Sequence, residues 1–269
     1  MALKPPEVLQ VPAILDLGSQ RLEYRRAARP GPRGLTIVLL HEGLGSADGW
    51  WPFADTLAAA TGCPVFAYSR AGYGRSSPVA LPRPADYLER EARQVLPRVL
   101  DAGGIGACIL VGHSDGATIA ALAAAAGDPR IRGAALIAPH VVVEAATLEG
   151  VARARQAFEH GDLRRRLAPQ HSDVDGAFRG WSDTWLDPAR RAWDVRTELR
   201  GATVPLVLIQ GDRDRYGTGL QIEAVRRACP HAEIHRLPEI GHAPQDEDPR
   251  ATIRILADFV ARIRDSEPA

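Results

Sequence analysis

The chain has 269 residues, 45% of them hydrophobic, which is enough to bury a substantial core in one large domain or in a domain with an insertion. Lys plus Arg and Asp plus Glu each total 33, so the formal net charge is zero and no overall attraction to nucleic acid or to a membrane surface is expected. The apolar stretches are too short to span a bilayer, and the opening MALKPPEVLQVPA has no signal-peptide hydrophobic region. We therefore expect a cytoplasmic protein that acts on a small molecule.

Segments typical of buried strands alternate with helical segments along most of the chain. Two short alternating segments, 7–17 and 21–27, predict an antiparallel hairpin at a sheet edge. The buried strands expected after them span residues 35–42, 64–70, 107–114, 133–141 and 204–212. The expected helices span residues 50–61, 86–102, 116–127, 221–228 and 249–264. This alternation predicts a mostly parallel central sheet flanked by helices.

Residues 144–200 interrupt the alternation. They contain no strand-like run, only arginine-rich helical segments punctuated by proline and glycine. We expect them to form a helical cap inserted into a core domain made of residues 1–143 and 201–269. The balanced charge favours no particular oligomeric state.

Ser114 lies at a predicted strand-to-helix corner. The sequence ILVGHSDGATIAAL (109–122) passes from an apolar run to an alanine-rich helical pattern, with Gly112 and Gly116 on either side of the serine. Two glycines leave room for a strained turn that exposes the hydroxyl and points the amino terminus of the helix at it. We predict that Ser114 is a nucleophile; the alternative is a serine that only caps the helix.

A serine hydroxyl needs a base to take its proton and an acid to orient that base. Asp214 follows the strand 204–212, and His242 follows the strand-like segment 232–238. Asp212 directly follows a glycine and is expected to turn the loop, whereas Asp214 is far enough along to reach a histidine. The carboxyl ends of parallel strands meet at one sheet edge, so we predict that Asp214 and His242 meet the serine there.

The third requirement is a pair of backbone N–H groups for the charge that develops on a carbonyl oxygen. The glycine-rich turn LLHEGLGS supplies the N–H of Gly43 as first candidate and that of Leu44 as second, to be paired with the N–H of Asp115. In this prediction only the backbone of Asp115 is used, and its side chain is free to be polar. Attack by Asp115 itself is the competing idea, but this residue follows the apex of the turn rather than occupying it.

With these residues in place, the chain resembles the α/β-hydrolase fold superfamily of esterases, lipases and C–C hydrolases. The resemblance covers the His41 turn, YSRAGYGRSSP (68–78), the Ser114 corner, the Asp214 loop and the His242 loop. The order Ser, Asp, His is that of the superfamily. The resemblance implies an α/β-hydrolase core with Ser114 as nucleophile, His242 as general base and then acid, and Asp214 as orienting carboxylate.

Two departures from the family pattern place acidic side chains near the site. Glu42 stands in a His-Glu-Gly turn where His-Gly-Gly or His-Gly-x is commoner, and Asp115 replaces the usual apolar or amide residue. Both argue against anionic substrates and leave the three predicted catalytic residues intact.

Aromatic residues are the candidates for a substrate pocket. Trp181 and Trp185 are one helical turn apart in the expected cap, where they either pack a small subdomain or roof an apolar pocket. Trp50 and Trp51 follow the glycine turn and could touch the substrate. We also assign Leu44 and His140, each near the end of a strand, to the substrate site.

No cofactor or metal is expected. The run Gly43-Leu44-Gly45 is not a dinucleotide fingerprint, because Asp48 stands where the third glycine belongs. His171, Asp173 and Asp175 alternate as possible metal ligands, but a solvated loop is the favoured interpretation.

These features together predict a cofactor-independent serine hydrolase that cleaves a small carboxylic ester through an acyl-enzyme. Thioester, lactone and C–C bond (diketone) hydrolysis are alternatives, because they use nearly the same residues. A perhydrolase, a hydroxynitrile lyase and a non-catalytic ligand receptor on the same fold also remain open.

Overall fold

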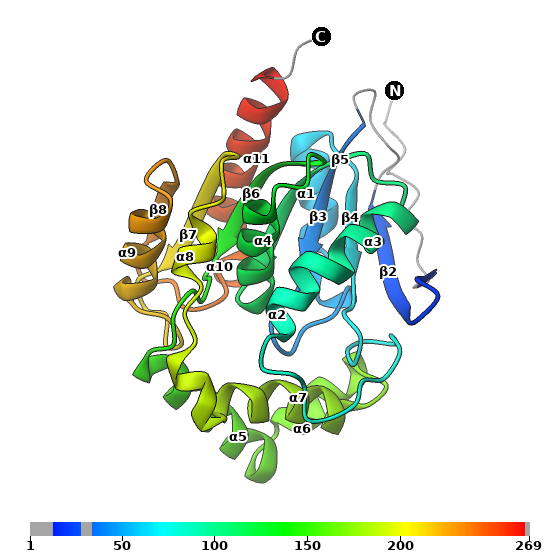
Figure 1. The fold of residues 1–269 in the computed structure, drawn as a ribbon, viewed down its shortest axis with the longest axis vertical. Coiled ribbons are helices and arrows are strands. Elements are labelled where there is room, and N and C mark those ends of the chain that lie inside the picture. Colours follow the sequence, from blue (N-terminus) through cyan, green and yellow to red (C-terminus); the bar gives the residue numbers. More distant parts are fainter. Residues whose placement is uncertain (1–12, 28–33, 267–269) are drawn as a thin grey trace.

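The computed structural model describes residues 13–27 and 34–266 (Figure 1). Residues 7–12 of the first expected strand segment lie outside this part of the chain. Within the described residues, no helix combines the length and the apolar character needed to cross a membrane.

The centre of the fold is an eight-stranded, mostly parallel sheet, as the sequence predicts. Its strands are β1 (Ala13–Asp16), β2 (Arg21–Ala27), β3 (Leu35–Leu40), β4 (Val65–Tyr68), β5 (Ala107–His113), β6 (Ile131–Ile137), β7 (Leu206–Gly211) and β8 (Glu233–Leu237). Their order across the sheet is β1-β2-β4-β3-β5-β6-β7-β8. Only β1 and β2 run antiparallel to their neighbours, which confirms the expected edge hairpin. The strands from β3 to β8 therefore end at the same edge of the sheet.

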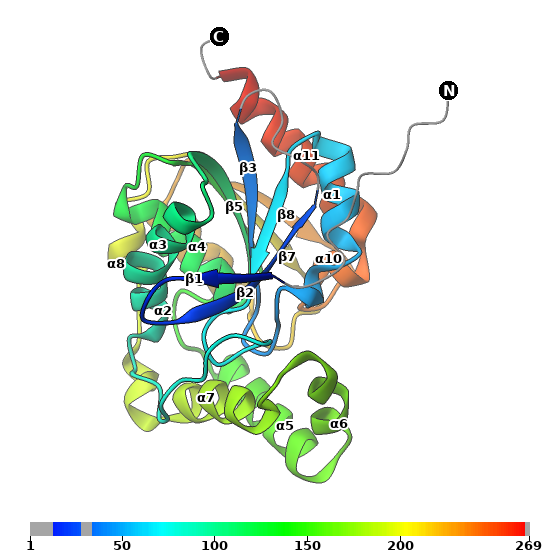
Figure 2. The same ribbon diagram turned by 90° about the vertical axis from the view of Figure 1, so that its right-hand side faces the viewer.

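Helices cover both faces of the sheet. In chain order they are α1 (Phe53–Thr61), α2 (Tyr87–Arg90), a π-helical stretch (Glu91–Val95), α3 (Leu96–Ala102), α4 (Asp115–Ala126), α5 (Ala145–His160), α6 (Leu163–Leu167), α7 (Val174–Leu186), α8 (Arg196–Leu199), α9 (Gly219–Ala228), α10 (Pro244–Glu247) and α11 (Pro249–Ser266), with short 3₁₀ turns at Asp48–Trp50, Ala168–Gln170 and Pro188–Ala192. Figure 2 shows α1 and α11 on one face and α3 and α4 on the other. The repeated strand-helix alternation therefore closes into the layered α/β architecture expected from the sequence.

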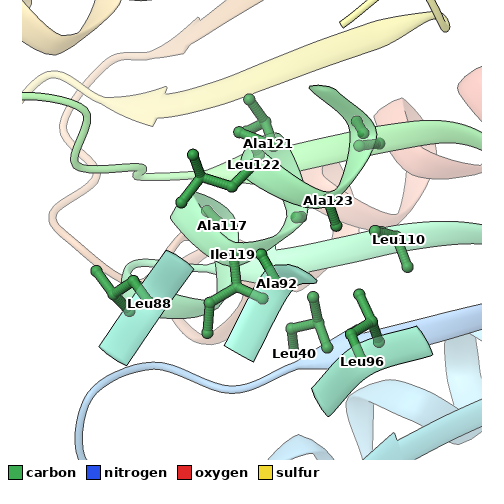
Figure 3. Close-up of a cluster of buried hydrophobic side chains, with 14 of the residues drawn as sticks. Leu40, Leu88, Ala92, Leu96, Leu110, Ala117, Ile119, Ala121, Leu122 and Ala123 are labelled. Carbon is green, nitrogen blue, oxygen red and sulfur yellow. The ribbon is translucent and has the colours of Figure 1, made fainter. Parts of the chain in front are cut away.

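Small side chains let α4 lie close to the sheet. Figure 3 shows Ile119 and Ala123 of this helix gathered with Leu40 of β3, Leu110 of β5 and Leu96 of α3. All five side chains are almost completely buried. The close packing of α4 fixes the position of its amino terminus, where Ser114 and Asp115 are found.

Helices α5, α6 and α7 form a separate layer beyond one end of the sheet in both views (Figures 1 and 2). The segments that lead into and out of this layer lie next to each other. Val142 pairs with Asp194 in an isolated antiparallel bridge, and the N–H of Val195 donates to the carbonyl of Val141 at 3.0 Å. The layer is an excursion from the sheet domain between β6 and β7, at the position where the sequence predicts a cap.

Candidate active site

Ser114 occupies the corner between β5 and α4 with φ 54° and ψ −117°, in the left-handed region that residues other than glycine rarely adopt. Glycine is required on both sides of Ser114 because backbone atoms pass too close for a side chain. A Cβ at Gly112 would lie 2.1 Å from the carbonyl oxygen of Gly116, and a Cβ at Gly116 would lie 2.0 Å from the carbonyl oxygen of Leu40. The sequence therefore imposes the turn that exposes the hydroxyl of Ser114, and the surrounding packing holds it in place.

His242 and Asp214 reach Ser114 from loops that follow β8 and β7. The Nε2 atom of His242 is 3.0 Å from the Oγ of Ser114, and its Nδ1 atom is 2.8 Å from the Oδ2 of Asp214. Asp212 points elsewhere and pairs with Arg236 at 2.8 Å. The structure thus brings the three predicted residues into one hydrogen-bonded chain, with Asp214 rather than Asp212 in contact with the histidine.

Asp214 is held in place by three further groups. Its Oδ2 accepts a hydrogen bond from Gln210 Nε2 at 2.7 Å, and its Oδ1 accepts from the backbone N–H groups of Tyr216 at 2.7 Å and Gly217 at 3.2 Å. Burial alone would raise the pKa of this carboxyl, but its hydrogen bond with His242, the histidine charge and the backbone donors lower it to about 2. Asp214 is therefore an ionised acceptor that can orient the imidazole.

The loop that carries His242 is fixed from two sides. The backbone N–H groups of Gly241 and Ala243 both donate to the carboxylate of Glu247, at 2.7 and 3.1 Å. On the other side, the ring Nε2 of His113 lies 2.8 Å from the carbonyl oxygen of His242. Because His113 directly precedes Ser114, this bond ties the backbone of His242 to the side chain of the residue next to Ser114.

A serine, a histidine and a carboxylate in this arrangement can activate a hydroxyl group. The imidazole can accept the serine proton while the carboxylate stabilises the resulting imidazolium. This chemistry also needs N–H groups directed at the reacting oxygen.

The peptide between Glu42 and Gly43 has a fixed orientation in the turn after β3. The carbonyl of Glu42 points into the core, where it accepts from His41 Nδ1 at 2.7 Å and Arg70 Nη2 at 2.8 Å. In a trans peptide the N–H points opposite to the carbonyl, so the N–H of Gly43 points away from these two donors. Gly43 and Ser114 line the same cavity. The N–H of Asp115 lies in the first turn of α4 and has no acceptor within the helix.

A cavity of about 100 Å³ lies beside Ser114, between the sheet edge and the helical layer. It is lined by Glu42, Gly43, Leu44, Ser114, Asp115, His140, Thr147, Val151, Trp181, Trp185, Tyr216 and His242. Four predicted substrate residues, Leu44, His140, Trp181 and Trp185, are in this set.

Trp50 and Trp51 do not line the cavity. Trp50 is buried among α1 residues on the face of the sheet that α11 covers. Trp51 lies under the guanidinium of Arg25, 4.0 Å from the ring centre, and its indole N–H donates to Asp55 at 3.0 Å. Trp50 ends the short 3₁₀ turn before α1 and Trp51 follows it, so nearness in sequence to the glycine turn does not bring either ring to the cavity.

The side chain of Asp115, for which the sequence predicts no catalytic use, has hydrogen-bond partners of its own. It is 1% exposed, its Oδ2 accepts a hydrogen bond from the hydroxyl of Tyr87 at 2.5 Å, and its Oδ1 accepts from the indole N–H of Trp185 at 3.2 Å. Since Trp185 lies in α7, this carboxylate joins the residue after Ser114 to the wall of the cavity.

His140 is a neutral residue in the cavity lining. Its ring lies 5.6 Å from that of His242 and makes an edge contact with Trp185 at 5.5 Å. Burial, reinforced by the neighbouring His242, lowers the pKa of His140 from 6.5 to about 3. His140 therefore presents an uncharged ring beside the three predicted catalytic residues.

The segment with possible metal ligands has structural contacts instead. His171 accepts a hydrogen bond at Nδ1 from the N–H of Gly74 (3.0 Å) and donates from Nε2 to the carbonyl of Leu44 (2.9 Å). Asp173 caps α7, and Asp175 pairs with Arg164 at 2.6 Å. In the described part of the chain, no group of three or more His, Cys, Asp or Glu residues is arranged to hold a metal.

Sequence reasoning missed several lining residues. Thr147 and Val151 are one turn apart at the start of α5, and Tyr216 follows Asp214 by two positions. The spacing of Thr147 and Val151 is a detectable stripe, but it does not reveal which side of the helix faces the sheet. Glu42 also lines the cavity, whereas the sequence indicates only an acidic residue next to Gly43.

Comparisons with known proteins agree with this architecture. The model of the Alpha/beta hydrolase family matches residues 37–255. A relative from Pseudomonas savastanoi pv. phaseolicola, which bears the provisional name carbamate hydrolase RutD, is 29% identical over 247 residues, covering 83% of this chain and 93% of the relative. Esterase Rv0045c from Mycobacterium tuberculosis is 26% identical over 259 residues, covering 86% of this chain and 84% of the relative.

A solved structure shows the same fold. The enol-lactonase from Burkholderia xenovorans LB400 superposes with a TM-score of 0.71 at 22% identity. The superposition covers 93% of this chain and 100% of the enol-lactonase chain. The family match spans most of the sequence, and the mostly parallel eight-stranded sheet agrees with it. This chain therefore belongs to the alpha/beta hydrolase family.

Proposed function

We propose that the protein is a cofactor-independent serine hydrolase that cleaves small, uncharged carboxylic esters. The observation that carries the proposal is the hydrogen-bonded chain from Ser114 through His242 to Asp214, with distances of 3.0 and 2.8 Å, at the wall of a small cavity. The family membership and the named esterase relative support hydrolytic chemistry.

In the acylation step, Ser114 Oγ attacks the carbonyl carbon of the ester and His242 Nε2 takes the hydroxyl proton. The negative charge that forms on the carbonyl oxygen is stabilised by the N–H groups of Gly43 and Asp115. The tetrahedral intermediate collapses, the ester C–O bond breaks, and His242 returns the proton to the leaving alcohol.

In the deacylation step, a water molecule attacks the acyl-enzyme while His242 takes one of its protons. Collapse of the second tetrahedral intermediate releases the carboxylic acid and returns the proton to Ser114. Asp214 stays ionised throughout, because its pKa is held at about 2, and it stabilises the imidazolium in both steps.

The cavity supports a small and uncharged acyl group. Its volume of about 100 Å³ is well below the roughly 300–1,000 Å³ of sites for drug-sized ligands. Among the described residues that line it, none is Lys or Arg, whereas Glu42 and Asp115 are acidic. The described cavity wall therefore offers no Lys or Arg side chain to pair with an anionic acyl group.

Steady-state hydrolysis of p-nitrophenyl acetate, butyrate and octanoate tests the proposal. We expect turnover with acetate and butyrate, weak turnover with octanoate, and a loss of at least about 10³-fold in kcat for Ser114→Ala and for His242→Ala. An Asp212→Asn variant should keep activity, because Asp212 pairs with Arg236 and not with the histidine. Unchanged hydrolysis by Ser114→Ala would refute the proposal.

The same panel distinguishes the alternatives. Thioesters, γ-lactones and vinylogous diketones present related carbonyl groups to the same residues, so the highest kcat/KM assigns the bond that is cleaved. Peroxide-dependent halogenation and cyanohydrin cleavage identify a perhydrolase or a lyase. Tight ligand binding without multiple turnover would identify a receptor.

A further inference from the structure

The indole of Trp181 lies directly against Gly43. A Cβ on this glycine would come within 2.1 Å of the Nε1 atom of Trp181 and 2.3 Å of its Cδ1 atom. The edge of the ring that carries the N–H therefore lies over the residue whose backbone N–H is the proposed donor to the substrate oxygen. Any side chain at position 43 would displace this edge.

Buried tryptophan N–H groups usually find an acceptor. Three of the other indole N–H groups donate to carboxylates of this chain, in the pairs Trp51–Asp55, Trp185–Asp115 and Trp193–Glu89. The N–H edge of Trp181 instead lies against Gly43, and the residue lines the cavity together with Ser114. A substrate oxygen in this cavity is the acceptor that the arrangement suits.

The position of Trp181 relative to Gly43 is fixed by neighbouring contacts. Phe178 meets its ring edge-on, with centroids 5.8 Å apart. His171, three residues before α7, donates to the carbonyl of Leu44 at 2.9 Å and accepts from the N–H of Gly74 at 3.0 Å. The helical layer is thus tied to the glycine turn next to the place where the indole meets it.

The residues that line the cavity favour stabilisation of an oxyanion by an uncharged hydrogen-bond donor. Glu42 and Asp115 both line the cavity, and the pKa of Glu42 is lowered to about 2, since its interaction with His113 outweighs the effect of burial. None of the described lining residues is Lys or Arg, so no cation of the lining is available to stabilise a developing oxyanion. N–H dipoles held in a fixed direction can stabilise the oxyanion without adding a cation.

We propose that Trp181 is a third hydrogen-bond donor to the substrate, which acts beside the backbone N–H of Gly43 and stabilises the oxyanion formed when Ser114 attacks. This inference rests on the proposed function, and it makes transition-state stabilisation depend on the helical layer being docked on the sheet domain. The substrate class it fits is an ester whose acyl carbonyl reaches α7.

The test removes the indole N–H and keeps an aromatic ring. Trp181→Phe is compared with Trp193→Phe, which also removes an indole N–H. The indole N–H of Trp193 donates to Glu89 at 2.8 Å, and Trp193 does not line the cavity. A second variant carries benzothienylalanine at position 181, which keeps the bicyclic shape and replaces the N–H by sulfur. Unfolding midpoints of all variants establish that they are folded.

For p-nitrophenyl butyrate we expect kcat to fall at least tenfold in both position-181 variants, with KM within threefold of the natural protein. Inhibition by 1,1,1-trifluorohexan-2-one, which forms an anionic adduct with a serine, should weaken at least tenfold, whereas binding of hexan-2-one should change less than twofold. Trp193→Phe should leave all of these quantities within threefold.

The inference is overturned if kcat and trifluoroketone inhibition stay within twofold in the benzothienylalanine variant. It is also overturned if the two ketones weaken equally, since the ring would then act only through its shape. Ser114→Ala in the same assay separates the two proposals. If Ser114→Ala retains turnover, the proposed function is wrong, and if it is inactive while both position-181 variants are fully active, only the role of Trp181 is wrong.

Discussion

The indole N–H of Trp185 donates to the carboxylate of Asp115 at 3.2 Å, which joins the residue after Ser114 to the helix that walls the cavity. Tyr87 donates to the same carboxylate at 2.5 Å, and all three side chains are buried. The acidic residue next to the predicted nucleophile therefore has a structural role: it holds together the sheet domain and the helical layer.

Replacing Asp115 by Ala should destabilise the fold, because it leaves a buried hydroxyl and a buried indole N–H without their acceptor. We expect the free energy of unfolding to fall by about 3 kcal/mol. Urea denaturation followed by circular dichroism measures this change. Tyr87→Phe, which removes one of the two donors, should cost about 1 kcal/mol. Equal stability of Asp115→Ala and the natural protein would contradict this role.

Gly116 should tolerate no side chain. A Cβ there would lie 2.0 Å from the carbonyl oxygen of Leu40, and backbone atoms cannot rotate away. We expect Gly116→Ala to lose about 3 kcal/mol or more of unfolding free energy, together with hydrolytic activity. The matched control is Gly219→Ala at the start of α9, where a Cβ meets nothing within 4 Å. Thermal unfolding of the two variants should differ widely, and similar midpoints would show that the turn can relax.

The stability of the protein should fall as the pH drops from 7 toward 4. Burial lowers the pKa of His140 to about 3 in the folded state, against 6.5 for an unperturbed histidine. Between these two values the unfolded chain binds a proton that the folded chain does not, so stability is lost as the pH falls through this window. His41 and His171 are also buried with lowered pKa values and act in the same direction, whereas His113, whose pKa the neighbouring Glu42 raises despite burial, acts in the opposite direction.

Urea denaturation at pH 7, 6, 5 and 4 measures this dependence. One such histidine contributes a slope of up to about 1.4 kcal/mol per pH unit. His140→Phe keeps an aromatic ring against Trp185 and should reduce the slope near pH 5 by up to that amount. A slope identical to that of the natural protein would mean that His140 takes up a proton in the folded state as readily as in the unfolded chain.

Glu247 should matter for catalysis although it touches none of the three proposed catalytic side chains. It accepts from the backbone N–H groups on both sides of His242 and so positions the loop. Glu247→Ala should lower kcat for p-nitrophenyl butyrate at least about tenfold, because small displacements of a catalytic group are costly. Asp258→Ala, on the exposed side of α11, is the control and should be silent. Full activity of Glu247→Ala would show that the loop holds its shape without this carboxylate.

The sheet was predictable because its signals are local. Five apolar runs between helical patterns correspond to β3, β4, β5, β6 and β7. The meeting of Ser114, Asp214 and His242 was also predictable, since each follows a strand and parallel strands end at one edge.

The contacts between the sheet domain and the helical layer could not be predicted in the same way. The partners of Asp115 lie 28 and 70 positions away, and those of His171 lie 97 and 127 positions away, so no local pattern connects them. Trp50 and Trp51 illustrate the opposite error, because proximity in sequence to Gly43 does not determine the direction in which a following turn points its side chains.

Covalent labelling of the protein with a fluorophosphonate, followed by peptide mass spectrometry, tests directly whether Ser114 is the nucleophile. We expect one phosphonyl group per chain on the peptide that contains Ser114, no labelling of Ser114→Ala, and much slower labelling of His242→Ala. Labelling at another residue, or no labelling of a folded protein, would contradict the claim that Ser114 is the nucleophile.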